Sequence, residues 1–176
     1  MKFVEHYFTE ALLYKIFLDM DGVICDFEGG FEKLSPNKTF DEYEEADAWK
    51  IINDAGVDFW ATLPWLDGGK ELWNALKPYN PTILSRPSRS KDSITGKIKW
   101  IEDNLADEND KLPKYIIETD KAKYSGTNRI LIDDDSDNIE NWEDADGIGI
   151  LYIDVKSALK LLQKYMPDLK KELDNI

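Results

Sequence analysis

The chain has 176 residues, of which 42% are hydrophobic and six are tryptophan, so it can bury one sizeable hydrophobic core. Its formal net charge of −14 disfavours duplex nucleic acid as a partner, because such binding depends on Lys and Arg contacts to phosphate. No apolar stretch is long enough to span a bilayer, and the amino-terminal residues do not resemble a secretion signal. With a single cysteine, Cys25, these features predict a cytoplasmic monomer or homodimer that has no membrane partner.

Short strands and amphipathic helices are predicted to alternate along the chain. Strands are expected at 15–20, 81–85, 115–117, 129–133 and 148–153. Helices are expected at 26–34, 41–53, 70–77, 97–104 and 138–145, with an amphipathic tail at 155–173 that Pro167 interrupts. Ile98, Ile101 and Leu105 are expected to face the core from the fourth of these helices. Residues 59–65 look aromatic and irregular, and residues 1–14 receive no role. The alternation predicts an α/β fold in which helices cover both faces of a parallel sheet.

Two of the predicted strands end in carboxylates. The apolar run Ile16-Phe17-Leu18 leads to Asp19 and Asp21, and Gly22 then breaks the strand. The run Ile130-Leu131-Ile132 leads to Asp133-Asp134-Asp135 in the same way. In an open α/β sheet, ligands bind outside the carboxyl ends of the strands. We therefore expect one acidic pocket to which both strands contribute.

These residues resemble a known family. Asp19-Met20-Asp21-Gly22-Val23 is similar to the Asp-x-Asp-Gly-(Val/Thr) signature of the haloacid dehalogenase superfamily, which consists mostly of phosphotransferring hydrolases. That superfamily also has a Ser or Thr that ends the second strand, then a lysine, then an acidic pair. Ser85, Lys97 or Lys121, and Asp133-Asp134 supply these elements in the same order. Four elements in order are much more specific than one Asp-x-Asp motif.

Within this superfamily the chain resembles the 5′(3′)-deoxyribonucleotidases. The similarity lies in Asp19–Phe31, in Gly96–Glu102, where the family has a lysine three residues before a tryptophan, and in Asp120-Lys121. Two departures concern nucleotide specificity and leave the hydrolytic chemistry intact. The region between Phe27 and Phe59 is shorter than in the mammalian members, and Arg86 stands where a small hydroxyl residue usually follows the strand.

The resemblance implies a Mg²⁺-dependent phosphomonoesterase that dephosphorylates (deoxy)nucleoside monophosphates through an aspartyl-phosphate. Asp19 is implied to be the nucleophile and a metal ligand. Asp21 is implied to be the general acid and base, with its backbone carbonyl as a second metal ligand. Asp134 is the first choice for the third ligand and Asp133 supports it, while Asp137 is a weaker outer candidate.

Phosphate binding is implied for five further residues, which are Gly22, Ser85, Arg86, Lys97 and Lys121. Ser85 and backbone N–H groups would hydrogen-bond the phosphoryl oxygens, and the two lysines would neutralise charge on them. Arg86 would add a guanidinium fork, or would point to solvent. Lys123 would replace Lys121 if the register of the loop were shifted.

Residues 27–64 occupy the position of the superfamily's cap, so the predicted domains are a core of 1–26 and 65–176 and a small helical insert of 27–64. Phe27 and Trp49 lie where the nucleotidases place aromatic residues that contact the base. Stacking on a base suits such side chains. The alternative is that the aromatic residues form a small core of the cap itself, and packing is favoured for most of them, including Phe59, Trp60 and Trp65.

Two other functions stay open. The chain could be a phosphatase for another small phosphoester, such as a sugar phosphate or a polynucleotide end, because a superfamily does not define its substrate. It could also be a non-catalytic module that binds a nucleotide or a metal, although the intact pair of Asp19 and Asp21 argues against this. The only histidine, His6, is far from the motifs, which excludes a histidine-based mechanism.

Overall fold

The computed structural model describes residues 14–169, and His6 and the predicted end of the tail lie outside them. Five parallel strands form one sheet in the order β3-β2-β1-β4-β5. Their bounds are β1 (Lys15–Leu18), β2 (Thr82–Ser85), β3 (Lys114–Ile117), β4 (Arg129–Asp133) and β5 (Ile148–Leu151). All five strands were predicted, and the α/β architecture with a parallel sheet is confirmed.

Seven α-helices lie within the described residues. They are α2 (Phe27–Leu34), α3 (Glu45–Ala55), α4 (Val57–Ala61), α5 (Gly69–Leu76), α6 (Lys91–Leu105), α7 (Ser136–Asp144) and α8 (Val155–Leu162). Four short 3₁₀ turns accompany them, which are η1 (Phe40–Glu42), η2 (Lys77–Tyr79), η3 (Lys121–Tyr124) and η4 (Pro167–Leu169).

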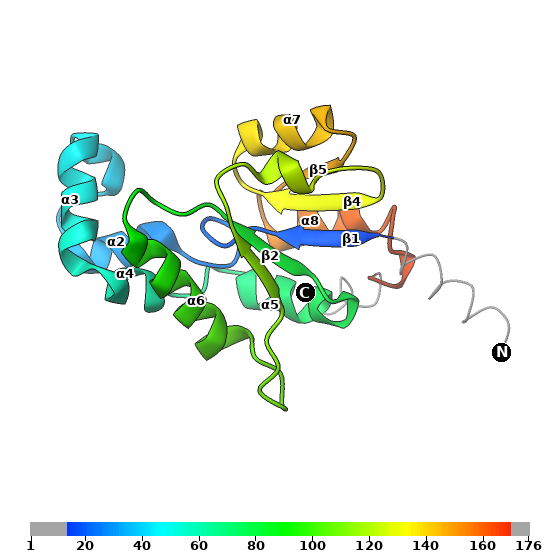
Figure 1. Ribbon diagram of the computed structural model, residues 1–176, viewed down its shortest axis with the longest axis horizontal. Coiled ribbons are helices and arrows are strands. Elements are labelled where there is room, and N and C mark those ends of the chain that lie inside the picture. The colour runs from blue at the N-terminus through cyan, green and yellow to red at the C-terminus, as the bar shows by residue number, and fades with distance from the viewer. Residues whose placement is uncertain (1–13, 170–176) are drawn as a thin grey trace, which may run out of the picture.

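Helices cover both faces of the sheet, as the continuous apolar strands require. Ile16 and Leu18 of β1 point into the main core, which also holds buried residues of α5, α6 and α8. Phe17 lies on the opposite face and packs against Trp142 of α7, with ring centroids 5.1 Å apart. Figure 1 shows α7 on one side of the sheet and α5 and α6 on the other. The arrangement is consistent with a Rossmann-like α/β fold.

The helices α2, α3 and α4 lie beyond the end of β1, to the left in Figure 1. Their aromatic side chains pack against one another: the rings of Phe27 and Phe59 are 5.5 Å apart and those of Phe31 and Phe40 are 5.4 Å apart. Helix α4 is docked closely on α6. A β-carbon at Gly96 would overlap Trp60 and would lie 2.6 Å from the Val57 carbonyl oxygen. Residues 27–64 are thus helical, and their role as a cap stays a prediction.

Several helices differ from the prediction, among them α8, which ends at Leu162, short of the predicted tail, and α7, which begins at Ser136, two residues early. Helix α3 begins at Glu45 and not at 41, because Thr39 and Glu42 form a capping box on η1 instead. The stretch predicted as irregular, 59–65, overlaps the second half of α4, a helix that follows a reversal at Gly56, where φ is +63°. Helix α6 begins at Lys91, six residues earlier than predicted, because the Ser90 side chain caps it.

One packing detail on α6 also differs. Ile98 was expected to face the core and is only half-buried, whereas Trp100 is buried and donates from Nε1 to the Leu63 carbonyl at 2.8 Å. Ile101 and Leu105 are buried, as predicted. The indole ring can be buried on this helix because its N–H finds a backbone acceptor there.

Candidate active site

The order in which successive strands are added to the sheet reverses beside β1. From β1 it proceeds outward to β2 and β3, and it then returns to the other side of β1 as β4. Such a switch point leaves a crevice at the carboxyl ends of the two central strands. Asp19 directly follows β1, and its backbone N–H donates to the Ile132 carbonyl of β4 at 3.0 Å. The two acidic strand ends are therefore neighbours, as predicted.

A tight turn follows β1 and positions the second carboxylate. The Met20 carbonyl accepts hydrogen bonds from the backbone N–H groups of Ile24 at 2.9 Å and Cys25 at 2.7 Å. Gly22 lies in the left-handed region with φ of +73°, a conformation that glycine adopts without strain. Cys25 is fully buried.

Lys121 lies between the first carboxylate of each strand end. Its Nζ is 2.9 Å from Asp19 Oδ2 and 2.6 Å from Asp133 Oδ2. All three residues are buried. Burial lowers the pKa of Lys121, but Asp19 and Asp133 outweigh it and leave the pKa above its usual value. The lysine is thus held in its charged form between two carboxylates.

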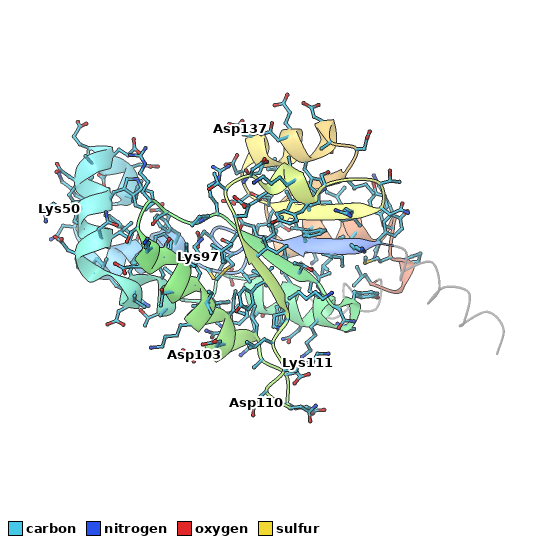
Figure 2. The ribbon with its side chains drawn as sticks, in the orientation of Figure 1. Lys50, Lys97, Asp103, Asp110, Lys111 and Asp137 are labelled. Carbon is cyan, nitrogen blue, oxygen red and sulfur yellow. The ribbon has the colours of Figure 1, made fainter. Side chains whose placement is uncertain are left out.

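Lys97 holds the other carboxylate of the first motif. It is almost fully buried, and its Nζ donates to Asp21 Oδ2, to Ser85 Oγ at 2.8 Å and to the Arg86 carbonyl at 2.8 Å. Figure 2 shows Lys97 on α6, at the centre of the molecule between the helices α2 to α4 and the sheet. Burial raises the pKa of Asp21, and Lys97 opposes that increase. One lysine thereby connects Asp21 with the end of β2.

Asp19, Asp133 and Asp134 form a group that could hold a metal ion, because one carboxylate oxygen of each lies within 4.8 Å of the others. Partial burial, followed by Asp19 and Asp133, raises the pKa of Asp134 to about 6. Asp134 approaches the motif's glycine so closely that a β-carbon at Gly22 would overlap its carboxylate. A loop glycine is therefore required for Asp134 to reach the site.

The residues present fit a divalent cation. Four carboxylates (Asp19, Asp21, Asp133 and Asp134) and the buried Lys97 and Lys121 leave a formal charge of −4 + 2, which is −2. Asp19 Oδ1 and Asp21 Oδ1 are buried and have no hydrogen-bond partner among the described residues. Oxygen-only ligands are those that Mg²⁺ and other hard cations prefer. The charge and the unpartnered oxygens both suit such an ion.

Arg86 and Asn138 complete this side of the site. Nη2 of Arg86 donates to Asn138 Oδ1 at 2.8 Å. Asn138 Nδ2 donates to both oxygens of Asp133, at 3.1 and 3.2 Å. Asn138 was missed in the sequence, although its place four residues after Asp134 puts it on the first turn of α7, beside the same strand end.

Two adjoining cavities open onto these residues. A cavity of about 340 Å³ is lined by Asp19, Asp134, Lys121 and Asn138, among others. A cavity of about 790 Å³ lies beside it and is lined by Trp49 and Trp60. Asp21, Phe27 and Arg86 line both. Phe27 and Trp49, predicted to contact substrate, thus face the larger cavity and its junction with the smaller one.

The structure excludes two alternative candidates, Lys123 and Asp137, from the group of charged residues around Asp19. Lys123 is exposed and pairs with Glu118 at 3.4 Å, so the register of the loop is the one that places Lys121 in the site. Asp137 is exposed at the start of α7 (Figure 2) and lines neither of the two cavities. The predicted packing role of the other aromatic residues is confirmed, because Phe59 and Trp60 are buried and Trp65 packs against a neighbouring indole.

No helix in residues 14–169 is long and apolar enough to cross a membrane. Neither the protein-family models nor the curated protein sequences compared with this chain give a match. The class of protein that the structure defines is an α/β protein with a five-stranded parallel sheet and an acidic site at the switch point of that sheet.

Proposed function

We propose that the protein is a Mg²⁺-dependent phosphoric monoester hydrolase of the haloacid dehalogenase type. The observation that supports this most is that the two oxygens of the Asp19 carboxylate have different surroundings. Oδ2 is held by Lys121 at 2.9 Å, while Oδ1 has no hydrogen-bond partner among the described residues. The same side chain lines the smaller cavity. An oriented carboxylate with one free oxygen is what attack on a phosphorus atom requires.

In the proposed reaction, Asp19 Oδ1 attacks the phosphorus atom and forms an aspartyl-phosphate, while the bond to the leaving oxygen breaks. Asp21 gives that oxygen a proton, and then takes one from the water that hydrolyses the aspartyl-phosphate. Lys121, which lines the smaller cavity, stabilises the negative charge of the phosphoryl oxygens, whereas Ser85 is fully buried, lines neither of the two cavities and accepts a hydrogen bond from Lys97. Asp19, Asp134 and Asp133 would hold Mg²⁺, which when bound neutralises phosphoryl charge.

We further propose that the substrates are nucleoside monophosphates, with deoxyribonucleotides foremost. The larger cavity supports this assignment because its wall carries the partly exposed aromatic rings of Phe27 and Trp49. Such rings offer a stacking surface to a base. The cavity adjoins the smaller one at Asp21 and Phe27, so a leaving group there would lie beside the proposed proton donor.

The test is release of inorganic phosphate in the presence of Mg²⁺. The panel contains deoxyribonucleoside and ribonucleoside monophosphates, sugar phosphates and a generic aryl phosphate. We expect selective turnover of deoxyribonucleotides, and a loss of about 10³-fold or more in the Asp19→Asn variant. Asp137→Asn is the matched control, because it removes an exposed carboxylate of α7 that lines neither cavity.

The other outcomes discriminate among the alternatives. Turnover of the aryl phosphate or of sugar phosphates alone would retain the hydrolytic chemistry and remove the nucleotide assignment. If no compound released phosphate, and Asp19→Asn retained the wild-type affinity for a bound nucleotide, the protein would be a binding module and not an enzyme.

A further inference from the structure

Arg86 lines both cavities but has one neutral partner. Its Nη2 donates to Asn138 Oδ1 at 2.8 Å, and its guanidinium makes no other hydrogen bond in the part of the chain that the structure describes. Glu28, Asp134 and Asp135 line the smaller cavity with it, yet none of these carboxylates forms an ion pair with Arg86 among the described residues. Most of the five guanidinium donors are therefore free.

The orientation of the Asn138 amide follows from its two partners. A guanidinium can only donate hydrogen bonds and an ionised carboxylate can only accept them, so Oδ1 must face Arg86 and Nδ2 must face Asp133. The side chain of Asn138 is buried. A buried amide with both ends engaged holds a fixed position.

A neutral amide has a specific advantage at this position. A carboxylate in place of Asn138 would orient the guanidinium equally well, but it would cancel the charge of Arg86 and repel Asp133. The amide orients Arg86 and leaves its charge available. A positioned, uncompensated arginine at the junction of two cavities suits an anionic ligand, because its planar fork matches the oxygens of a phosphate group.

We propose that Asn138 is a positioning residue that holds Arg86 as the phosphate-binding arm of the site. The inference deepens the proposed function, because in an active phosphatase the bound anion would be the phosphoryl group of the substrate. The buried hydrogen bond to Asn138 restricts the guanidinium to one region of the cavity before the ligand arrives. Arg86 thus binds phosphate at a smaller cost in side-chain entropy.

The test is a double-mutant cycle on the binding of inorganic phosphate, measured by calorimetry in the presence of Mg²⁺. We expect Arg86→Gln to weaken phosphate binding about tenfold, as the loss of one charge-assisted contact does. Asn138→Ala should weaken binding about threefold to tenfold in the wild-type background, and less than about twofold when Arg86→Gln is already present. Lys91→Gln is the control, because it removes an exposed charge of the same segment that lines neither cavity.

A purely structural role for Asn138 gives a different result. Support of Asp133 alone would make the loss from Asn138→Ala equally large with and without Arg86, and this outcome would overturn the proposal. With an aryl phosphate as substrate, the coupled part of the effect should appear in KM, because Arg86 would hold the phosphoryl group before and during transfer alike. If Asn138→Ala does not fold, Asn138→Ser replaces it, since a hydroxyl there is too short to reach both partners.

The outcomes separate this inference from the proposed function. Coupling on inorganic phosphate without turnover of any phosphoester would support the role of Asn138 and refute the hydrolase. Turnover of a phosphoester with additive effects of the two variants would support the hydrolase and refute the role of Asn138. A wild-type protein that binds no inorganic phosphate would overturn the inference directly.

Discussion

The backbone of Gly22 packs directly against the carboxylate of Asp134. A β-carbon at Gly22 would lie 2.5 Å from Asp134 Cγ, which is far inside van der Waals contact. Gly22 also has φ of +73°, where any other residue is strained. The glycine of the first motif and the acidic pair of the last one are thus fitted to each other across two strands.

This contact predicts the effect of Gly22→Ala. The variant should lose about 1–3 kcal/mol of stability through backbone strain, and should bind Mg²⁺ more weakly because Asp134 must move. Urea denaturation and a Mg²⁺ titration measure the two effects. The matched control is Gly126→Ala, which also has a positive φ (+139°) but whose β-carbon would meet no atom closer than 4.0 Å. Equal Mg²⁺ affinity in the wild type and Gly22→Ala would contradict the role assigned to this contact.

A divalent cation should stabilise the fold, because it relieves the formal charge of −2 that the four clustered carboxylates and two lysines leave at the site. At a Mg²⁺ concentration one hundred times its Kd, the expected gain is about 2.7 kcal/mol, or about 5–10 °C in Tm. Differential scanning fluorimetry at constant ionic strength measures it. Asp134→Asn should reduce the shift and Asp137→Asn should not, since only Asp134 belongs to the carboxylate group. A shift of the same size in Asp134→Asn would refute the proposed ligand set.

Replacement of Lys121 should be far more damaging than replacement of Lys123, two residues later on η3. The Lys121 side chain is 2% exposed and bridges two carboxylates, whereas that of Lys123 is 55% exposed. Lys121→Met should destabilise the protein by about 3 kcal/mol, because an unpaired carboxylate is left in the interior. Lys123→Met should change stability by less than about 0.5 kcal/mol. Chemical denaturation at pH 7 decides between these values.

The stability of Lys121→Met should also depend on pH. Burial and then Asp19 raise the pKa of Asp133, and Lys121 lowers it, so Lys121→Met should raise that pKa further. The native variant then retains a proton that the unfolded chain loses, and its stability falls as pH rises. The deficit relative to wild type should therefore be smaller at pH 5 than at pH 8. A deficit that is independent of pH would indicate lost packing and not lost charge compensation.

Tyr152→Phe should be neutral or stabilising, by up to about 1 kcal/mol. The Tyr152 hydroxyl is buried and has no hydrogen-bond partner among the described residues, so its removal abolishes a desolvation cost. Tyr43→Phe is the contrasting control, because that hydroxyl lies 2.8 Å from Ser35 Oγ and its loss should cost about 1 kcal/mol. Thermal unfolding should rank the two variants on opposite sides of wild type, and a clear loss of stability in Tyr152→Phe would contradict the expectation.

Alkaline pH provides a second test of Tyr152. Burial, followed by Asp154, Asp67 and Glu71, raises the pKa of Tyr152 to about 12. Between pH 10 and 12 the native state retains a proton that the unfolded chain releases, so wild-type stability falls by about 1.4 kcal/mol per pH unit from this group. The advantage of Tyr152→Phe over wild type should accordingly grow above pH 10.

The local features of the site could be predicted because they depend on a few consecutive residues. Apolar runs of strand length before Asp19 and before Asp133 predicted β1 and β4, and Gly22 predicted the turn between Asp21 and Val23. The start of α3 was wrong because a capping box on η1 and a helix start have the same sequence signature. The helix α4 was missed because aromatic residues that pack on α6 show no clear period within five residues.

What the sequence alone determined about this protein is its α/β architecture, the two strands that carry carboxylates, and the order of acidic, hydroxyl and basic residues along the chain. Strand length, turn chemistry and alternation are local, so one chain suffices to reveal them. Only the tertiary structure decided that Lys121 bridges Asp19 to Asp133 and that Lys97 binds Asp21. Many lysines have the reach for such a contact, and which one makes it depends on the packing of α6 and η3 around the sheet.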